Sequence, residues 1–275
     1  MNKSADQMKR ESSAIVRQQL QQSILSTSFA TACVLFFFSR FGLFFSEFTI
    51  ARGQPIGLIY YSTIFLQNAV SISSIAISSL AYSLSFQEDK KSGLLPYIFV
   101  RARADDYMLS KCLACFWSSF LVAFIAYSFC TLTVFALNQA NLGILPDPEV
   151  FALLKPFQRM QIESPSLYYF LIIVNNSLHC AVWSLFALMT TVFTDDLYMT
   201  VGATYLGYVY LSRVLFFAFG LKAFSPALSF YGGARILEDM PTGLVFTLNV
   251  LEILLVATIF SAMAVLRLRK SLEKR

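Results

Sequence analysis

The chain is a succession of long apolar segments separated by shorter polar ones. Each apolar segment is at least as long as the roughly 20 residues with which a helix crosses a bilayer. These segments are residues 24–45, 56–86, 112–137, 167–193, 197–219 and 243–266. The pattern predicts an all-α membrane protein with six transmembrane helices.

The overall composition supports this prediction. Of the 275 residues, 57% are hydrophobic and only 13% are charged, and the mean hydropathy is +0.63. No soluble domain of this size buries so much apolar surface. Six spans leave no room for a sizeable soluble domain, so we expect an N-terminal segment, 1–23, followed by one transmembrane domain, 24–275.

The N-terminal segment has the pattern of a helix lying on a membrane surface. On a helical wheel Lys9, Arg10 and Arg17 lie outside the apolar arc. That arc holds Ala5, Met8, Ile15, Val16 and Leu20. The arrangement predicts an interfacial helix on the inner leaflet. The alternative is a disordered basic tail.

Lysine and arginine are unevenly distributed among the polar segments. Fourteen lie in the N-terminal segment, the segment 86–111 and the C-terminal segment, against five in the other connections. The positive-inside rule then places both termini and residues 87–111 in the cytoplasm, and the loop 138–166 outside. We expect a multi-pass protein of the plasma (inner) membrane. The net charge of +5 follows from this rule, and no nucleic-acid partner is needed to explain it.

Two polar segments predict short helices. In the first, Pro96 suits a first helical turn, the apolar face comprises Leu94, Leu95, Ile98 and Phe99, and Arg101 and Arg103 follow. This predicts a helix under the membrane that presents an apolar docking face. In the second, 222–242, glycine and proline interrupt a run too short to span, which predicts re-entrant helices that enter from the outer face before the last span.

These two segments carry a family resemblance. Glu88, Gly93, Arg101-x-Arg103, Tyr107 and Lys111 resemble the cytosolic loop of type-2 exporter permeases, the membrane subunits of ATP-binding-cassette (ABC) transporters. The run 224–235, which has a proline near its start and ends at an arginine, resembles the segment before their last span. The chain departs from the family at Ser92-Gly93-Leu94, where many members have Gly-Thr.

The resemblance covers most of the chain and implies a function. It identifies the loop 87–111 with the coupling helix that docks on an ATPase subunit, so Glu88, Gly93, Arg101, Arg103, Tyr107 and Lys111 are candidate coupling residues. It also implies two ATPase subunits, which bind ATP and Mg, and a second permease subunit, identical or homologous. Between spans two and five it implies a translocation path, with candidate residues Gln67, Asn68, Ser71, Tyr205 and Tyr208.

The chain lacks the motifs of an enzyme. It has no Gly-x-x-x-x-Gly-Lys-[Ser/Thr] phosphate loop, no paired histidines with an acid and no Gly-x-Ser-x-Gly elbow. We therefore expect no cofactor, no metal and no catalytic residue in this chain. For His179, which is near Asn175 and Asn176, we expect hydrogen-bonded packing rather than a proton relay. For Asp195-Asp196 we expect helix capping rather than a metal or catalytic role.

Three charged residues fall inside predicted spans. Arg40 is near the outer end of its span, where its side chain can snorkel to water. Arg213 and Glu252 lie deeper, where a charge costs roughly 3 kcal/mol or more. They can form a structural ion pair, or they can face a hydrated substrate path.

Two other functions are compatible with the topology. A non-transporting accessory or immunity protein would need no docking loop, and a secondary carrier or channel would favour an inverted repeat, which the halves do not show. Lipid, glycan, peptide and small toxic molecule are all compatible substrates.

Overall fold

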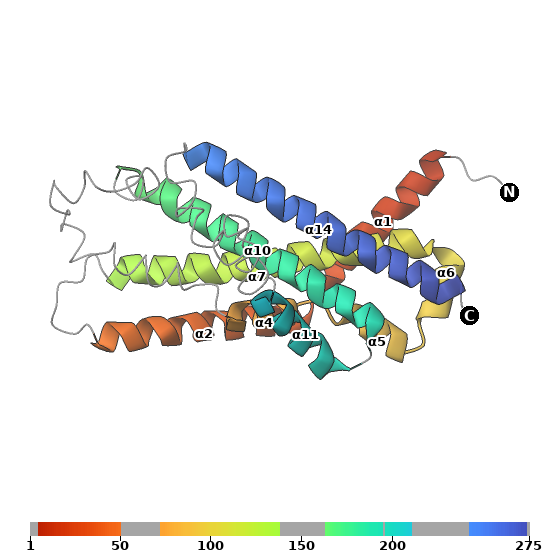
Figure 1. Ribbon diagram of the computed structural model, residues 1–275, viewed down its shortest axis with the longest axis horizontal. Helices are drawn as coiled ribbons and strands as arrows, with labels where there is room; N and C mark the ends of the chain where they lie inside the picture. The colour runs from red at the N-terminus through yellow and green to blue at the C-terminus, as the bar shows by residue number, and fades with distance from the viewer. Residues whose placement is uncertain (1–4, 51–71, 138–162, 195, 211–241, 274–275) are drawn as a thin grey trace.

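The computed structural model describes residues 5–50, 72–137, 163–194, 196–210 and 242–273, and every element in them is a helix (Figure 1). This confirms the all-α prediction. Among the described residues, three helices are long and apolar enough to cross a membrane: α7 (Ala104–Leu137), α10 (Pro165–Phe193) and α14 (Thr242–Glu273). A fourth span results if α1 (Ala5–Ile24) and α2 (Thr27–Ile50), which meet at a 49° bend, are taken as one. These long apolar helices indicate a membrane protein.

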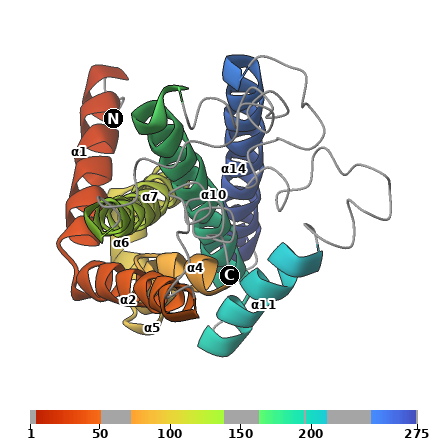
Figure 2. The same cartoon turned by 90° about the vertical axis from the view of Figure 1, so that its left-hand side faces the viewer.

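Helix α10 is the centre of the bundle (Figure 2). It packs against α7, α14, α4 (Ile72–Ser79) and α11 (Leu197–Val209). Within its apolar stretch 78% of the residues are buried, against 11% in α14, so α14 is peripheral. Helices α10 and α14 run in the same direction and α7 runs in the opposite one (Figure 1).

The N-terminal segment is helical, as predicted, and α1 packs along α7. The break before α2 has a local cause, because the hydroxyl of Ser26 donates to the carbonyl of Ser23 at 2.8 Å. The same hydroxyl accepts a hydrogen bond from the backbone N–H of Phe29 at 3.0 Å, as a helix N-cap does. Serine therefore ends one helix and starts the next.

The predicted second span, 56–86, is not one continuous helix in its described part. Helix α4 and α5 (Ser85–Lys91) are separated by turns at residues 80–84. There the N–H groups of Leu80 and Ala81 bond to carbonyls three residues back rather than four. The hydroxyl of Ser119 on α7 donates to the carbonyl of Ser78 at 3.0 Å, so this carbonyl accepts from Ser119 as well as from the N–H of Ala81.

The other described boundaries follow the hydropathy pattern with three extensions. Helix α2 continues to Ile50, past the predicted residue 45. Helix α7 begins at Ala104, before the predicted residue 112, and α14 continues to Glu273, past the predicted residue 266. Helix α10 ends at Phe193 as predicted. The capping prediction holds for Asp196, whose carboxylate accepts from the N–H of Tyr198 at 2.8 Å.

Arg40 does not reach the aqueous end of its helix. Its side chain is turned into the bundle and is 1% exposed. The guanidinium carbon lies 5.8 Å from the ring centroids of Phe36 and Tyr127, in cation–π geometry. The snorkelling prediction is therefore wrong, because aromatic faces inside the bundle take the place of water.

Several predictions lie outside the described residues. They concern the candidate path residues Gln67, Asn68 and Ser71, the charged residue Arg213, and most of the loop 138–166 and of the re-entrant segment 222–242.

Candidate functional site

The predicted helix under the membrane is present at the end of the bundle where α5, α6 (Leu95–Arg101), the start of α7 and the end of α14 meet (Figure 1). We call this the charged end. Pro96 stands in the first turn of α6, as expected. Gly93 joins α5 to α6 with a φ of +72°, which favours glycine. Around it Leu94 N–H bonds to the carbonyl of Asp89 and Gly93 N–H to that of Lys90, the pattern of a Schellman cap.

The faces of α6 differ from the prediction. Leu95, Ile98 and Phe99 pack inward against the core of the chain itself, where Phe99 meets the ring of Tyr107 edge-on at 5.8 Å. The side chains that face outward are Leu94, Tyr97 and Val100, which are 48%, 73% and 86% exposed. Three of the four residues of the predicted docking face are therefore packed within the chain, and the apolar surface available to a partner combines Leu94, which was predicted, with Tyr97 and Val100.

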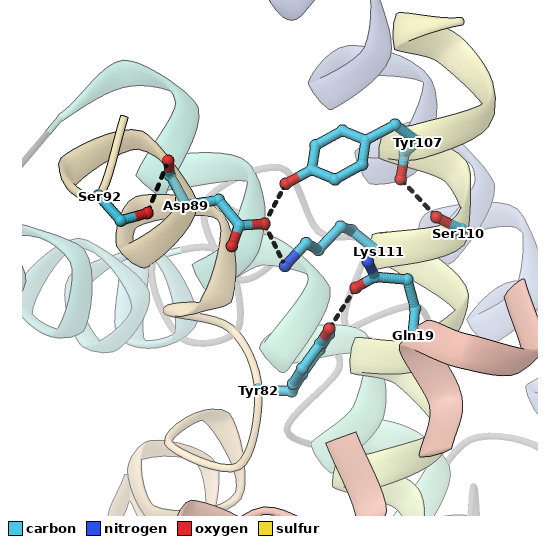
Figure 3. Close-up of polar contacts among 7 residues, drawn as sticks. All are labelled: Gln19, Tyr82, Asp89, Ser92, Tyr107, Ser110 and Lys111. Carbon is cyan, nitrogen blue, oxygen red and sulfur yellow. Dashed lines mark hydrogen bonds and ion pairs between the residues drawn. The ribbon is translucent and has the colours of Figure 1, made fainter. Parts of the chain in front are cut away.

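The carboxylate of Asp89 fixes α5, and with it the α5–α6 unit, to α7 (Figure 3). The ammonium of Lys111 lies 2.8 Å from Oδ2 of Asp89, and the hydroxyl of Tyr107 donates to the same oxygen. The Lys111 side chain is 3% exposed and that of Asp89 21%. A buried ammonium is tolerated only when it is paired, so Asp89 is the group that permits Lys111 to lie inside.

The contacts of Lys111 extend to two further elements. Its ammonium lies 5.0 Å from the centroid of the Tyr82 ring, a cation–π distance. The hydroxyl of Tyr82 in turn donates to Oε1 of Gln19 on α1 (Figure 3). We call Gln19, Tyr82, Asp89, Tyr107 and Lys111 the Asp89 cluster. It joins α1, the turns at 80–84, α5 and α7.

The structure brings two of the predicted coupling residues together and leaves the others apart. Tyr107 and Lys111 share the Asp89 carboxylate, whereas Glu88 and Arg103 are exposed and outside the cluster. Arg101 is the last residue of α6, and its side chain is outside the described ones.

Asp89 is the residue that sequence reasoning missed. Tyr107 and Lys111 are four residues apart and so share a helix face, which indicates that they act together. A lysine at the start of an apolar segment also needs an acid. The sequence offers Glu88 and Asp89 side by side, and only the position of α5 decides between them.

A cavity of about 510 Å³ lies between α1 and α6. The polar residues Gln18, Gln19, Gln22, Asp89 and Tyr107 line it together with apolar ones such as Ile98. Helices α5 and α6 therefore border this cavity, to which Asp89 and Ile98 contribute.

A second link ties α14 to α7 at the same end. The guanidinium of Arg269 forms a bidentate pair with Asp105, in which Nε donates to Oδ1 at 2.6 Å and the second nitrogen to Oδ2. The arginine is 54% exposed, so water and salt screen the pair. The pair therefore adds little to the stability of the fold, but it holds the end of α14 in place beside the start of α7.

A separate polar group lies within the apolar part of the bundle. Asn249 on α14 donates to Oδ1 of Asn175 on α10, and His179 also lies within hydrogen-bonding contact of Asn249. The packing role predicted for His179 fits this arrangement, although Asn249 was not foreseen. Of the candidate path residues, Tyr208 is buried against Trp183 at 5.2 Å, and Tyr205 is exposed.

No family model, curated protein or solved structure matches this chain. In the part of the chain that the structure describes, no group of three or more His, Cys, Asp or Glu side chains is arranged to hold a metal ion. The class that the structure defines is thus an α-helical membrane protein with at least three candidate spans and a helical unit held at one end.

Proposed function

We propose that this chain is the membrane-spanning permease subunit of an ATP-driven ABC exporter. In this proposal it has six spans with both termini in the cytoplasm, pairs with a second permease subunit and docks on separate ATPase subunits. The charged end then faces the cytoplasm of a cell with a plasma (inner) membrane. The motifs of the loop 87–111 and of the run 224–235 support the assignment by their resemblance to type-2 exporter permeases.

The observation that carries the proposal is the outward face of α6. Tyr97 and Val100 are mostly exposed on a helix whose opposite face is already packed. Aromatic and aliphatic groups beside a cation such as Arg103 are the composition that protein interfaces favour. A partner protein at the charged end accounts for this face better than solvent does.

The attachment of α6 suits a coupling function. A force on α6 passes through Phe99 and through Asp89 to Tyr107 and Lys111 in the first turns of α7. Because α7 continues as one helix to Leu137, a displacement at the charged end reaches the apolar part of the bundle. A loop that only connected two spans would need neither contact.

Co-expression with the ATPase subunits of candidate exporters tests the proposal. The double reversal Arg101→Glu with Arg103→Glu is expected to abolish export and ATPase co-purification while membrane insertion persists. The pair Tyr97→Ala with Val100→Ala should weaken co-purification without changing any charge. Lys270→Glu, an exposed cation at the same end on α14, is the matched control and should behave as wild type.

The rival functions predict different outcomes. A non-transporting accessory or immunity protein, or a secondary carrier or channel, would retain its activity in the Arg101 and Arg103 variant. Unchanged export with unchanged ATPase co-purification in that variant would defeat the coupling proposal.

A further inference from the structure

Glu252 lies on α14, inside the apolar stretch that marks this helix as a candidate membrane span. Its side chain is partly exposed, beside the buried face formed by Ile253 and Ala257. Among the described residues none forms a hydrogen bond or an ion pair with its carboxylate. An ionisable group in this position is a candidate functional site, because bilayer surroundings make an unneutralised charge costly.

Neutral hydrogen-bonding groups lie one turn away. Asn249 precedes Glu252 by three residues, so the two are neighbours on the helix surface. Asn249 bonds to Asn175 and contacts His179 on α10. Helices α10 and α14 run in the same direction (Figure 1), so the register set by Asn249 and Asn175 puts Glu252 about level with residue 178, near the depth of His179.

Aromatic rings continue the same interface. Trp183 lies one turn beyond His179 and packs edge-on against Tyr208 at 5.2 Å and near Phe260 at 6.4 Å. The exposed side of α14 beside Glu252 carries Leu251 and Leu255, which are 57% and 63% exposed. A ligand dissolved in the bilayer therefore meets an apolar approach and then the carboxylate, which has the neutral amides one turn to one side along α14 and the aromatic rings on the other side.

We propose that Glu252 is the recognition site for a lipophilic cation that arrives from the bilayer. A carboxylate surrounded by apolar groups attracts a cation far more strongly than it would in water. Asn249 and His179 then hold polar groups of the ligand, and aromatic rings favour positive charge over negative. In this role Glu252 sets the substrate class of the proposed exporter, and to that extent the inference rests on the proposed function.

Equilibrium binding of radiolabelled tetraphenylphosphonium to the full chain in lipid nanodiscs tests the site. Wild-type protein should bind the probe saturably, Glu252→Asp should retain binding, and Glu252→Gln should weaken it at least tenfold. Glu273→Gln, which removes an exposed acid from the polar end of the same helix, is the matched control and should bind as wild type. Tetraphenylborate, which has the same shape and the opposite charge, should not compete.

A second measurement needs no variant and so is independent of folding defects. Dicyclohexylcarbodiimide modifies carboxyl groups inside membranes, and mass spectrometry locates the adduct. Tetraphenylphosphonium should protect Glu252 of the wild-type chain from it. Absence of saturable binding, equal binding by Glu252→Gln, or an unprotected or unreactive Glu252 would overturn the site, and an unreactive one is what an ion pair with Arg213 produces.

These measurements use this chain without an ATPase. Loss of ATPase co-purification therefore refutes the exporter and leaves the site standing, whereas loss of probe binding refutes the site and leaves the exporter standing.

Discussion

The ammonium of Lys111 lies 2.8 Å from Oδ2 of Asp89, which joins α7 to α5 across a loop of the chain. The two partners are not equally buried, since the lysine is 3% exposed and the aspartate 21%. Removal of the lysine and removal of the aspartate therefore have different consequences. The lysine depends on its partner for neutralisation, whereas the aspartate keeps some water and the Tyr107 hydroxyl.

Asp89→Asn should be the more damaging of the two single changes. It leaves the buried ammonium without a counter-charge, which typically costs about 3–5 kcal/mol. Lys111→Met should cost less, and the double variant should recover much of the loss. Thermal unfolding of the purified protein in detergent measures all three.

Glu88→Gln is the control, because it removes an adjacent acid that is exposed. Its unfolding temperature should match wild type. Equal losses for Glu88→Gln and Asp89→Asn would contradict the assignment of Asp89 as the partner of Lys111.

Gly93→Ala should destabilise the connection between α5 and α6. The glycine has a φ of +72°, and the space that an added Cβ would occupy is open, so the penalty is conformational and amounts to about 1–2 kcal/mol. Gly93→Asn should cost less, because asparagine tolerates this conformation. Thermal unfolding of the two variants beside wild type measures the difference.

Gly42→Ala is the matched control for that change. Gly42 lies within helix α2 and also has open space around it, and alanine is favoured there by up to about 1 kcal/mol. The two substitutions should thus shift the unfolding temperature in opposite directions. A loss of the same size at both positions would show that the positive φ of Gly93 is not the cause.

Hydropathy was sufficient to predict the helical class and the long apolar helices α7, α10 and α14. The end of α10 at Phe193, the Pro96-initiated helix and the Asp196 cap also follow from local sequence rules. These features depend on residues within a few positions of one another, so the local sequence is enough to predict them.

Features that depend on contacts between distant segments were not predictable in the same way. The break between α4 and α5 is supported by Ser119, which is distant in sequence. Whether Glu88 or Asp89 meets Lys111, and which face of α6 is packed, depend on how α5 and α6 lie against α7. The hydrophobic pattern shows that α6 has apolar residues, and only the packing shows that Leu95, Ile98 and Phe99 are used within the chain.

The predicted orientation is tested by cysteine labelling. Fourteen basic residues in the predicted inner segments against five in the outer ones place Lys90 inside and Asp147 outside. In intact cells an impermeant thiol reagent should label Asp147→Cys and not Lys90→Cys. Four of the five native cysteines are buried and Cys33 is partly so, which keeps the background low. The reverse labelling pattern would invert the topology and remove the proposed docking face from the cytoplasm.

The hydrogen bond from Asn249 to Asn175 should contribute a measurable coupling between α14 and α10. Side-chain hydrogen bonds between membrane helices average about 0.6 kcal/mol and reach about 1.7. Asn175→Ala or Asn249→Ala alone leaves one carboxamide without its partner in apolar surroundings, so the double variant should lose less stability than the two single losses together. A thermal-unfolding double-mutant cycle measures this difference.

Thr258 provides the control for this cycle, because its hydroxyl bonds within α14 to the carbonyl of Leu254. Thr258→Ala combined with Asn175→Ala should be additive within about 0.3–0.5 kcal/mol. Additive losses for Asn175 and Asn249 as well would mean that the peripheral helix α14 is held by apolar packing alone. In that case the asparagines would no longer fix the register that puts Glu252 near the depth of His179.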